Sequence, residues 1–141
     1  MKRILYILTL AVAILTGCEK GGEPEVQIPL EELICGEWKL IYPDAAVYVS
    51  FADDNTFEEY QSLNGEIYEL RRGTWNLEGN VLSGKYNDEE EWAYTYQTEI
   101  TDKILTLTAK EDITVKNMYT SCGIPDIVKE SCTIVVKSGL F

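Results

Sequence analysis

Apolar and polar residues alternate along most of the chain from Gly36 onward, in short segments separated by turn-forming residues. This period of two predicts β-strands with one buried face, because successive side chains of a strand point to opposite sides of a sheet. The expected strands are 36–42, 47–51, 56–63, 66–77, 81–86, 92–100, 104–110, 113–120 and 132–138. About eight or nine strands in sequential hairpins, with a strong turn signal at Asn64–Gly65, predict an all-β fold, an antiparallel up-and-down β-barrel in preference to a sandwich.

Two segments depart from this alternation. Leu30 to Leu33 are expected to form one short helical turn, and residues 122–131 form an irregular stretch with room for another. The stretch 30–141 is long enough for one core and too short for two. It is therefore expected to be a single barrel domain.

The first residues have a different pattern. An apolar run from Ile4 to Leu15 follows the positive charges of Lys2 and Arg3. The run is shorter than the roughly 20 residues that a membrane-spanning helix needs. It fits a secretory signal, which has a positive start, an apolar middle and a small-residue end.

The run ends in the sequence LTGC, which resembles the bacterial lipobox. The alternative is an ordinary signal followed by a chance cysteine. The lipobox resemblance implies that residues 1–17 are removed and that Cys18 receives a diacylglycerol and an N-acyl chain. Several acyl chains on one residue anchor a protein far more firmly than a single chain. Residues 18–29, rich in Gly, Pro and charge, are then expected to be a flexible tether from the membrane to the barrel.

Composition narrows the range of functions. The chain has 12 basic and 24 acidic residues, and removal of residues 1–17 leaves ten basic residues against the same 24. An acidic domain of this kind argues against nucleic acid as a partner, because nucleic-acid binding needs clustered Lys and Arg. The chain has no histidine, so serine–histidine and cysteine–histidine catalysis and histidine-ligated zinc are excluded. The expectation is a protein that is not an enzyme, with a carboxylate-based enzyme as the remaining catalytic option.

A partial repeat carries the first structural candidates. Gly36 and Trp38 in GEW recur as Gly73 and Trp75 in GTW. A glycine beside a large aromatic suits a barrel corner, where the glycine permits a sharp bend and the indole fills the barrel end. The other interpretation is two ordinary buried tryptophans.

The sequence CGEWKL, the second motif GTW and the hairpin FADDNTFEEY together resemble the lipocalin-like domain lipoproteins of Gram-negative bacteria. The resemblance runs from Leu30 to Ser138. It implies a lipocalin-like barrel that binds a ligand and an outer-membrane location in the cell envelope. It also implies that Trp38 lies across the closed end of the barrel as a structural plug. The chain departs from lipocalins proper because it is shorter, shows no packed terminal helix and has no arginine late in the sequence.

The strongest ligand-binding candidates are aromatic. Alternation places Trp92, Tyr94 and Tyr96 on one face of a strand and Tyr119 on one face of another, and Phe57 flanks the first hairpin turn. One interpretation is a packed core with tyrosine tips in solvent. The other is an aromatic cup for a small amphipathic, hydrophobic or sugar-like ligand, with Trp92 near the rim opposite Trp38. In that second case, loss of the Trp92 ring should affect stability less than loss of Trp38.

Charged groups give weaker signals. The acidic runs Asp88–Glu91 and Asp53–Asp54 lack the ligand spacing of a calcium loop and are expected to be solvated turns, so no metal or cofactor is expected. Arg71 and Arg72 must point to opposite faces of the sheet. The inward one is expected to pair with Glu59 or Glu69, with a clamp on a ligand carboxylate as the alternative.

The remaining cysteines are Cys35, Cys122 and Cys132. In an oxidising compartment, Cys122 and Cys132 are expected to form a disulfide that staples the irregular loop. A link between Cys35 and Cys132 is the alternative, because a closed barrel can bring its first and last strands together.

The functional hypotheses therefore come from two main classes. The first is a lipid-anchored, non-catalytic barrel that binds a small ligand. The second is an interaction or inhibitor module that uses a filled barrel as a scaffold to hold a protein partner at the cell surface.

Overall fold

A computed structural model describes residues 27–43, 46–62, 64–136 and 140–141. The expected signal peptide, Cys18 and most of the expected tether lie outside these residues. None of the helices within them is long and apolar enough to span a membrane.

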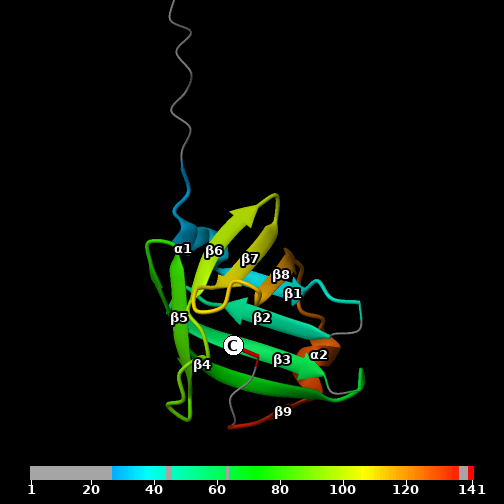
Figure 1. The fold of residues 1–141 in the computed structure, drawn as a ribbon. Helices are drawn as coiled ribbons and strands as arrows, with labels where there is room; N and C mark the ends of the chain where they lie inside the picture. The colour runs from blue at the N-terminus through cyan, green and yellow to red at the C-terminus, as the bar shows by residue number, and fades with distance from the viewer. Residues whose placement is uncertain (1–26, 44–45, 63, 137–139) are drawn as a thin grey trace, which may run out of the picture.

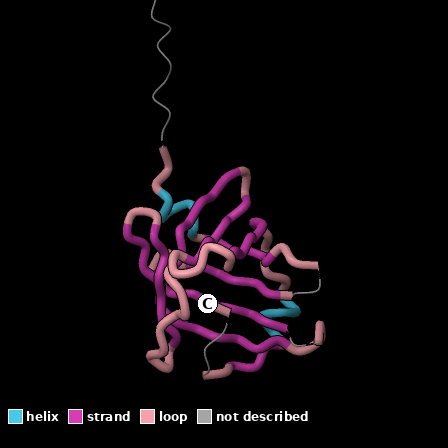
Figure 2. Tube along the Cα trace, in the orientation of Figure 1, coloured by secondary structure: helices cyan, strands magenta, loops and turns pink. Residues whose placement is uncertain are grey.

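The described chain is mostly strand, with two short helices (Figures 1 and 2). The helices are α1 (Leu30–Ile34) and α2 (Asp126–Glu130). The strands are β1 (Gly36–Leu40), β2 (Val47–Phe51), β3 (Thr56–Ser62), β4 (Tyr68–Glu78), β5 (Val81–Tyr86), β6 (Tyr96–Thr101), β7 (Ile104–Ala109), β8 (Lys116–Ser121) and β9 (Cys132–Ile134). The helical turns expected near Leu30 and within 122–131 are present as α1 and α2.

Strands β1 to β8 form a closed antiparallel barrel. Each pairs with the next along the chain, and β8 returns to pair with β1, where Leu40 lies opposite Tyr119. This confirms the predicted all-β up-and-down barrel. Closure pairs each of the eight strands with two neighbours, which leaves few free edges that could pair with another chain.

β9, at the start of the expected strand 132–138, is not part of the ring, so the first and last strands do not lie side by side. β9 instead pairs parallel to β4, with Cys132 opposite Tyr68 and Ile134 opposite Leu70. This is possible because β5 covers only the later part of β4, from Gly73 to Glu78. The first part of β4 therefore has a free side that β9 fills.

Strands β6 and β8 begin four and three residues later than the alternation predicts, at Tyr96 instead of 92 and at Lys116 instead of 113. The Asp112 carboxylate accepts hydrogen bonds from the Thr114 N–H at 3.0 Å and hydroxyl at 2.6 Å, which holds a turn before β8. The Glu111 carboxylate accepts hydrogen bonds from the Thr95 N–H at 3.0 Å and hydroxyl at 2.7 Å, which holds a loop before β6. Local side-chain hydrogen bonds to the backbone thus compete successfully with strand extension.

Both GxW motifs lie at tightly packed points of the barrel. Trp38 is 4% exposed, and its Nε1–H donates to the Ile34 carbonyl at the end of α1, at 2.8 Å. Trp75 is also 4% exposed, and its Nε1–H is shared between the carbonyls of Ala52 and Thr56 in the turn between β2 and β3. Each indole therefore binds backbone groups of a neighbouring segment.

The two glycines have different local requirements. Gly36 has φ +147°, in the region that favours glycine. A Cβ on Gly73 would lie 2.0 Å from the Lys85 carbonyl oxygen, so only glycine permits this approach of β4 and β5. Both positions thus demand glycine for the backbone, as a barrel corner does.

A second apolar cluster lies outside the barrel. Ile124 and Val128 from the α2 segment pack on Tyr48, Tyr60 and Leu70, which point outward from β2, β3 and β4. The Glu37 carboxylate holds this segment by accepting hydrogen bonds from the Ile124 N–H at 2.7 Å and the Lys129 ammonium at 2.6 Å. The chain after β8 therefore crosses the outer face of the sheet from β1 to β4.

Candidate functional site: the barrel interior

The interior of the barrel brings together most of the predicted aromatic cup. Phe57, Trp92, Tyr96 and Tyr119 are each at most 6% exposed and belong to one core cluster. Tyr94 is only partly buried and packs at the edge of this cluster, with its ring 6.3 Å from that of Tyr96. Alternation along the strands turns Phe57, Tyr96 and Tyr119 inward, whereas Trp92 and Tyr94 come from the loop between β5 and β6.

Trp92 is buried, which argues against the expectation that its loss would affect stability less than loss of Trp38. It is 6% exposed, and its ring lies 5.2 Å from Phe57 in an edge-to-face arrangement. A Cβ on Gly84 would lie 2.6 Å from the Trp92 ring, so glycine at 84 makes room for the indole. Trp92 is therefore as much a core residue as Trp38.

The ring that fills the cup is Phe141, which sequence reasoning missed. It is 3% exposed and stacks on Trp92 with ring centroids 4.4 Å apart and an interplanar angle of 23°. Its ring also meets those of Phe51, Phe57 and Tyr96 at 5.9–6.4 Å. A single aromatic residue has no periodicity that could have placed it in the interior. We call the four rings around it, Phe51, Phe57, Trp92 and Tyr96, the aromatic box.

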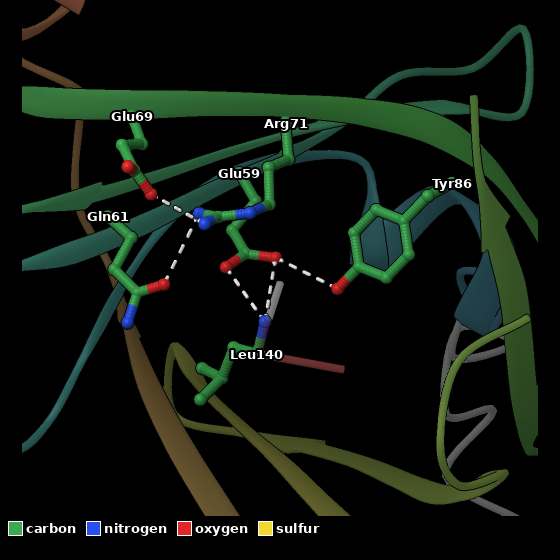
Figure 3. A network of polar contacts seen from close by, with 6 residues as sticks. All are labelled: Glu59, Gln61, Glu69, Arg71, Tyr86 and Leu140. Carbon is green, nitrogen blue, oxygen red and sulfur yellow. Dashed lines mark hydrogen bonds and ion pairs between the residues drawn. The ribbon is translucent and has the colours of Figure 1, made fainter. Parts of the chain in front are cut away.

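A polar network lies beside the aromatic box (Figure 3). Glu59 is fully buried, and its carboxylate accepts hydrogen bonds from the Tyr86 hydroxyl at 3.2 Å and from the Leu140 N–H at 3.0 Å. The Phe141 N–H donates to the Tyr86 hydroxyl oxygen at 3.1 Å. Two consecutive backbone amides, those of Leu140 and Phe141, therefore supply hydrogens to acceptors inside the barrel.

Arg71 lies opposite Glu59 in the pairing of β3 and β4 (Figure 3). Its guanidinium donates to the Glu69 carboxylate at 2.5 Å and to the Gln61 side-chain oxygen at 3.3 Å. Arg72 points outward and pairs with Glu58 at 2.8 Å. The inward arginine thus forms an internal ion pair, the favoured of the two expectations, and its charge also acts on Glu59.

Burial sets the proton affinity of these groups. Removal from water raises the pKa of Glu59, and the Leu140 N–H, the Arg71 charge and the Tyr86 hydroxyl oppose that rise. Burial also raises the pKa of Tyr96 to about 12 and that of Tyr119 well above its usual value. Both tyrosines are therefore neutral hydrogen-bond donors at physiological pH.

The raised pKa of Glu59 gives a pH-dependent contribution to stability. The folded state binds this proton more tightly than the unfolded state, so the contribution is fully present below the unfolded pKa of about 4.3 and is lost as the pH rises through the folded pKa. We expect the unfolding free energy of wild type, measured relative to Glu59→Gln in urea titrations, to fall as the pH rises from about 4.

Glu111→Gln is the contrasting control. The Thr95 hydroxyl lowers the pKa of Glu111, so wild type measured relative to this variant should become more stable as the pH rises, and less stable as it falls. A wild type–Glu59→Gln difference that stays constant or increases with pH would contradict the assignment of Glu59 as a destabilised buried carboxylate.

Four buried donors in the interior have no hydrogen-bond partner among the described residues. They are Arg71 Nε, Trp92 Nε1, Tyr96 Oη and Tyr119 Oη. Buried polar groups in native proteins are nearly always paired, and an unpaired one costs about 1–3 kcal/mol. The interior therefore offers hydrogens that its own side chains do not use.

Cys35, Cys122 and Cys132, the cysteines among the described residues, are free, so the predicted Cys122–Cys132 disulfide is not formed in the structure. Cys122 follows β8 and Cys132 begins β9, and the strands β1 to β4 lie between them. Adjacent strands are about 4.8 Å apart, whereas a disulfide needs Cα atoms within about 7 Å. The alternative link to Cys35 loses its basis as well, because the neighbour of β1 is β8 and not β9.

Comparison with known proteins adds one match. The family model of the lipocalin-like domain matches residues 34–107, just over half of the 141 residues. The matched stretch contains β1 to β6, most of β7, and both GxW motifs. It ends before β8, the outer helix α2 and Phe141. No curated protein matches the chain.

Proposed function

The chain belongs to the lipocalin-like domain family, and from this premise we propose that it is a lipid-anchored envelope lipoprotein whose non-catalytic barrel binds a small amphipathic ligand in its interior. An eight-stranded barrel is just wide enough either to be filled by side chains or to hold one small ligand, so this fold can serve as a ligand-binding scaffold. The ligand itself would be a small hydrophobic or sugar-like molecule.

The composition of the interior carries the proposal for a ligand. A barrel that served only as a scaffold would be expected to fill its centre with apolar side chains, since these fold without unpaired polar groups. This interior instead combines the aromatic box with a buried carboxylate, Glu59, and with unpaired donors on Trp92, Tyr96 and Tyr119. Apolar walls with a few convergent polar groups are the usual make-up of a small-molecule site.

The ligand proposal is tested with a neutral amphipathic probe, N-phenyl-1-naphthylamine, whose fluorescence rises in apolar surroundings. We expect saturable binding of one probe per chain, with quenching of tryptophan emission because Trp92 lines the site. The signal should disappear when the protein is unfolded in urea. Absence of saturable binding up to the solubility limit of the probe would contradict an interior ligand site.

The lipid anchor is supported by the N-terminal sequence, in which the apolar run after Lys2 and Arg3 ends at Cys18. We expect cells grown with a labelled fatty acid to label the protein and to retain it in the outer-membrane fraction. Cys18→Ala should abolish both, whereas Cys122→Ala, which removes an exposed cysteine of the barrel domain, should change neither. Label retained by Cys18→Ala would contradict the lipoprotein assignment.

A second candidate function is a protein-interaction or inhibitor module, and two observations favour it. The barrel centre is occupied by Phe141. In addition, Ile41, Tyr42 and Met118 are 41–68% exposed on β8 and the segment that begins with β1, beside an open groove of about 370 Å³. A photo-crosslinker at Tyr42 that captures an envelope protein, with none captured from exposed Ile113 on the loop before β8, would support this function.

A further inference from the structure

Leu140 and Phe141 lie inside the barrel without being part of its wall. The ring of eight strands closes through the β1–β8 and β3–β4 pairings, and the two residues belong to none of the strand pairings of the described chain. They are held by the ring contacts of Phe141 and by hydrogen bonds from two backbone amides. The barrel therefore does not need this segment to complete its backbone hydrogen bonds.

The space that the Phe141 ring occupies is shaped for an aromatic group. One wall is the Trp92 indole, stacked at 4.4 Å, and the rings of Phe57 and Tyr96 present near-perpendicular faces with interplanar angles of 82° and 79°. Offset stacking and edge-to-face packing are the two arrangements that aromatic rings prefer. An aliphatic group would fill the volume but would lose these contacts.

The polar groups around this space fall into two sets. Glu59 and Tyr86 accept hydrogen bonds, and the Leu140 and Phe141 amides satisfy them. Trp92 Nε1 and the hydroxyls of Tyr96 and Tyr119 are donors that have no acceptor among the described residues. Leu140 and Phe141 therefore pair with the acceptors and leave the three donors without partners among the described residues.

From these observations we propose that the barrel interior binds a small aromatic molecule that carries both N–H donors and carbonyl or hydroxyl oxygens, and that Leu140–Phe141 occupies the same space as an intramolecular competitor. The N–H groups of such a ligand replace the two amides at Glu59 and Tyr86, and its oxygens accept from Trp92, Tyr96 and Tyr119. The inference depends on the proposed function, that of an interior ligand site, and specifies the class of ligand.

With this competition, the apparent affinity equals the intrinsic affinity multiplied by the fraction of time for which the site is free. If the segment occupies the interior for about 90–99% of the time, the apparent affinity for a ligand falls about ten- to a hundredfold. Removal of the competing ring should recover that factor.

The test uses N-acetyl-L-phenylalaninamide, which has one aromatic ring, amide N–H groups and two carbonyl oxygens. Its dissociation constant is measured by calorimetry for wild type, for Phe141→Ala and for Val136→Ala, a control at an exposed residue. We expect Phe141→Ala to bind at least about tenfold more tightly than wild type, and Val136→Ala to match wild type. N-acetyl-L-leucinamide, with the same amides and no aromatic ring, should bind Phe141→Ala at least about tenfold more weakly than the phenylalanine probe.

A measurement on wild type keeps the test decisive if Phe141→Ala does not fold. In amide-resolved NMR, saturating N-acetyl-L-phenylalaninamide should shift the Leu140 and Phe141 resonances and raise their hydrogen exchange, while amides of the outer cluster such as Val128 stay unchanged. Unchanged Leu140 and Phe141 signals on binding of the probe would overturn the competitor assignment.

The other outcomes separate this inference from the proposed function. Equal affinity of wild type and Phe141→Ala for the aromatic probe would overturn the competition. Binding of N-phenyl-1-naphthylamine without binding of the amide probe would overturn the ligand class and leave the interior site standing. Failure of both probes on wild type and on folded Phe141→Ala would overturn the interior site itself.

Discussion

Trp38→Ala is expected to lower the free energy of unfolding by about 3–5 kcal/mol, the usual cost of removing a large buried aromatic side chain. The indole is 4% exposed within the main core cluster, and it donates a hydrogen bond to the Ile34 carbonyl at 2.8 Å. A domain of this size has about 5–15 kcal/mol of stability in total. Urea denaturation followed by circular dichroism should therefore show a much lower midpoint or no folded state.

Two further tryptophan variants help to interpret the effect of Trp38→Ala. Trp38→Phe keeps an aromatic ring but loses the hydrogen bond to Ile34, so it should be less damaging than Trp38→Ala. Trp92→Ala should be damaging as well, because Trp92 is buried at 6% exposure and stacks on Phe141. If Trp38→Ala unfolds at the same urea concentration as wild type, Trp38 does not support the fold.

Arg71→Met is expected to cost a similar amount, about 3–5 kcal/mol, because it leaves the buried Glu59 carboxylate and the partly buried Glu69 carboxylate without their positive partner. The Arg71 and Glu69 side chains are only 10% and 25% exposed, and the Arg71 charge also acts on the fully buried Glu59. Methionine has a similar length, so the loss reflects charge and hydrogen bonding more than volume. The measurement is again the urea midpoint at pH 7.

The neighbouring arginine provides the matched control. Arg72 is 45% exposed and pairs with Glu58 on the outer surface, so Arg72→Met should cost less than about 1 kcal/mol. Adding Glu59→Gln to Arg71→Met should recover part of the loss, because it removes one of the unpaired charges. Equal effects of Arg71→Met and Arg72→Met would show that the interior network does not stabilise the fold.

The barrel could be predicted from the sequence because strand alternation and short turns are local signals. Asn64–Gly65 and the alternation from Val47 to Phe51 are examples, since each depends only on neighbouring residues. The placement of β9 could not be predicted, because its apolar residues suit any free sheet edge. The free side on β4 beside Tyr68 exists only because β5 pairs with the later part of that strand.

Some interior residues could likewise be predicted from the sequence and others could not. Inward positions of Phe57, Tyr96 and Tyr119 follow from alternation, and one of two adjacent arginines had to face inward. Phe141 could not be placed, because its position depends on a ring stack with Trp92 that no sequence period encodes. The burial of Trp92 could not be inferred either, because it depends on contacts with Phe57 and Phe141, which are distant in the chain.

The segment after β8 also has a consequence for the order of events in folding. Val128 packs on Tyr48, Tyr60 and Leu70, which come from β2, β3 and β4, and β9 pairs with β4. This surface exists only once those three strands have paired, so we expect the segment to dock after them. Interactions absent from the folding transition state govern how fast a protein unfolds and leave its folding rate nearly unchanged. We therefore expect the outer cluster to lengthen the lifetime of the folded barrel with little effect on how fast the barrel forms.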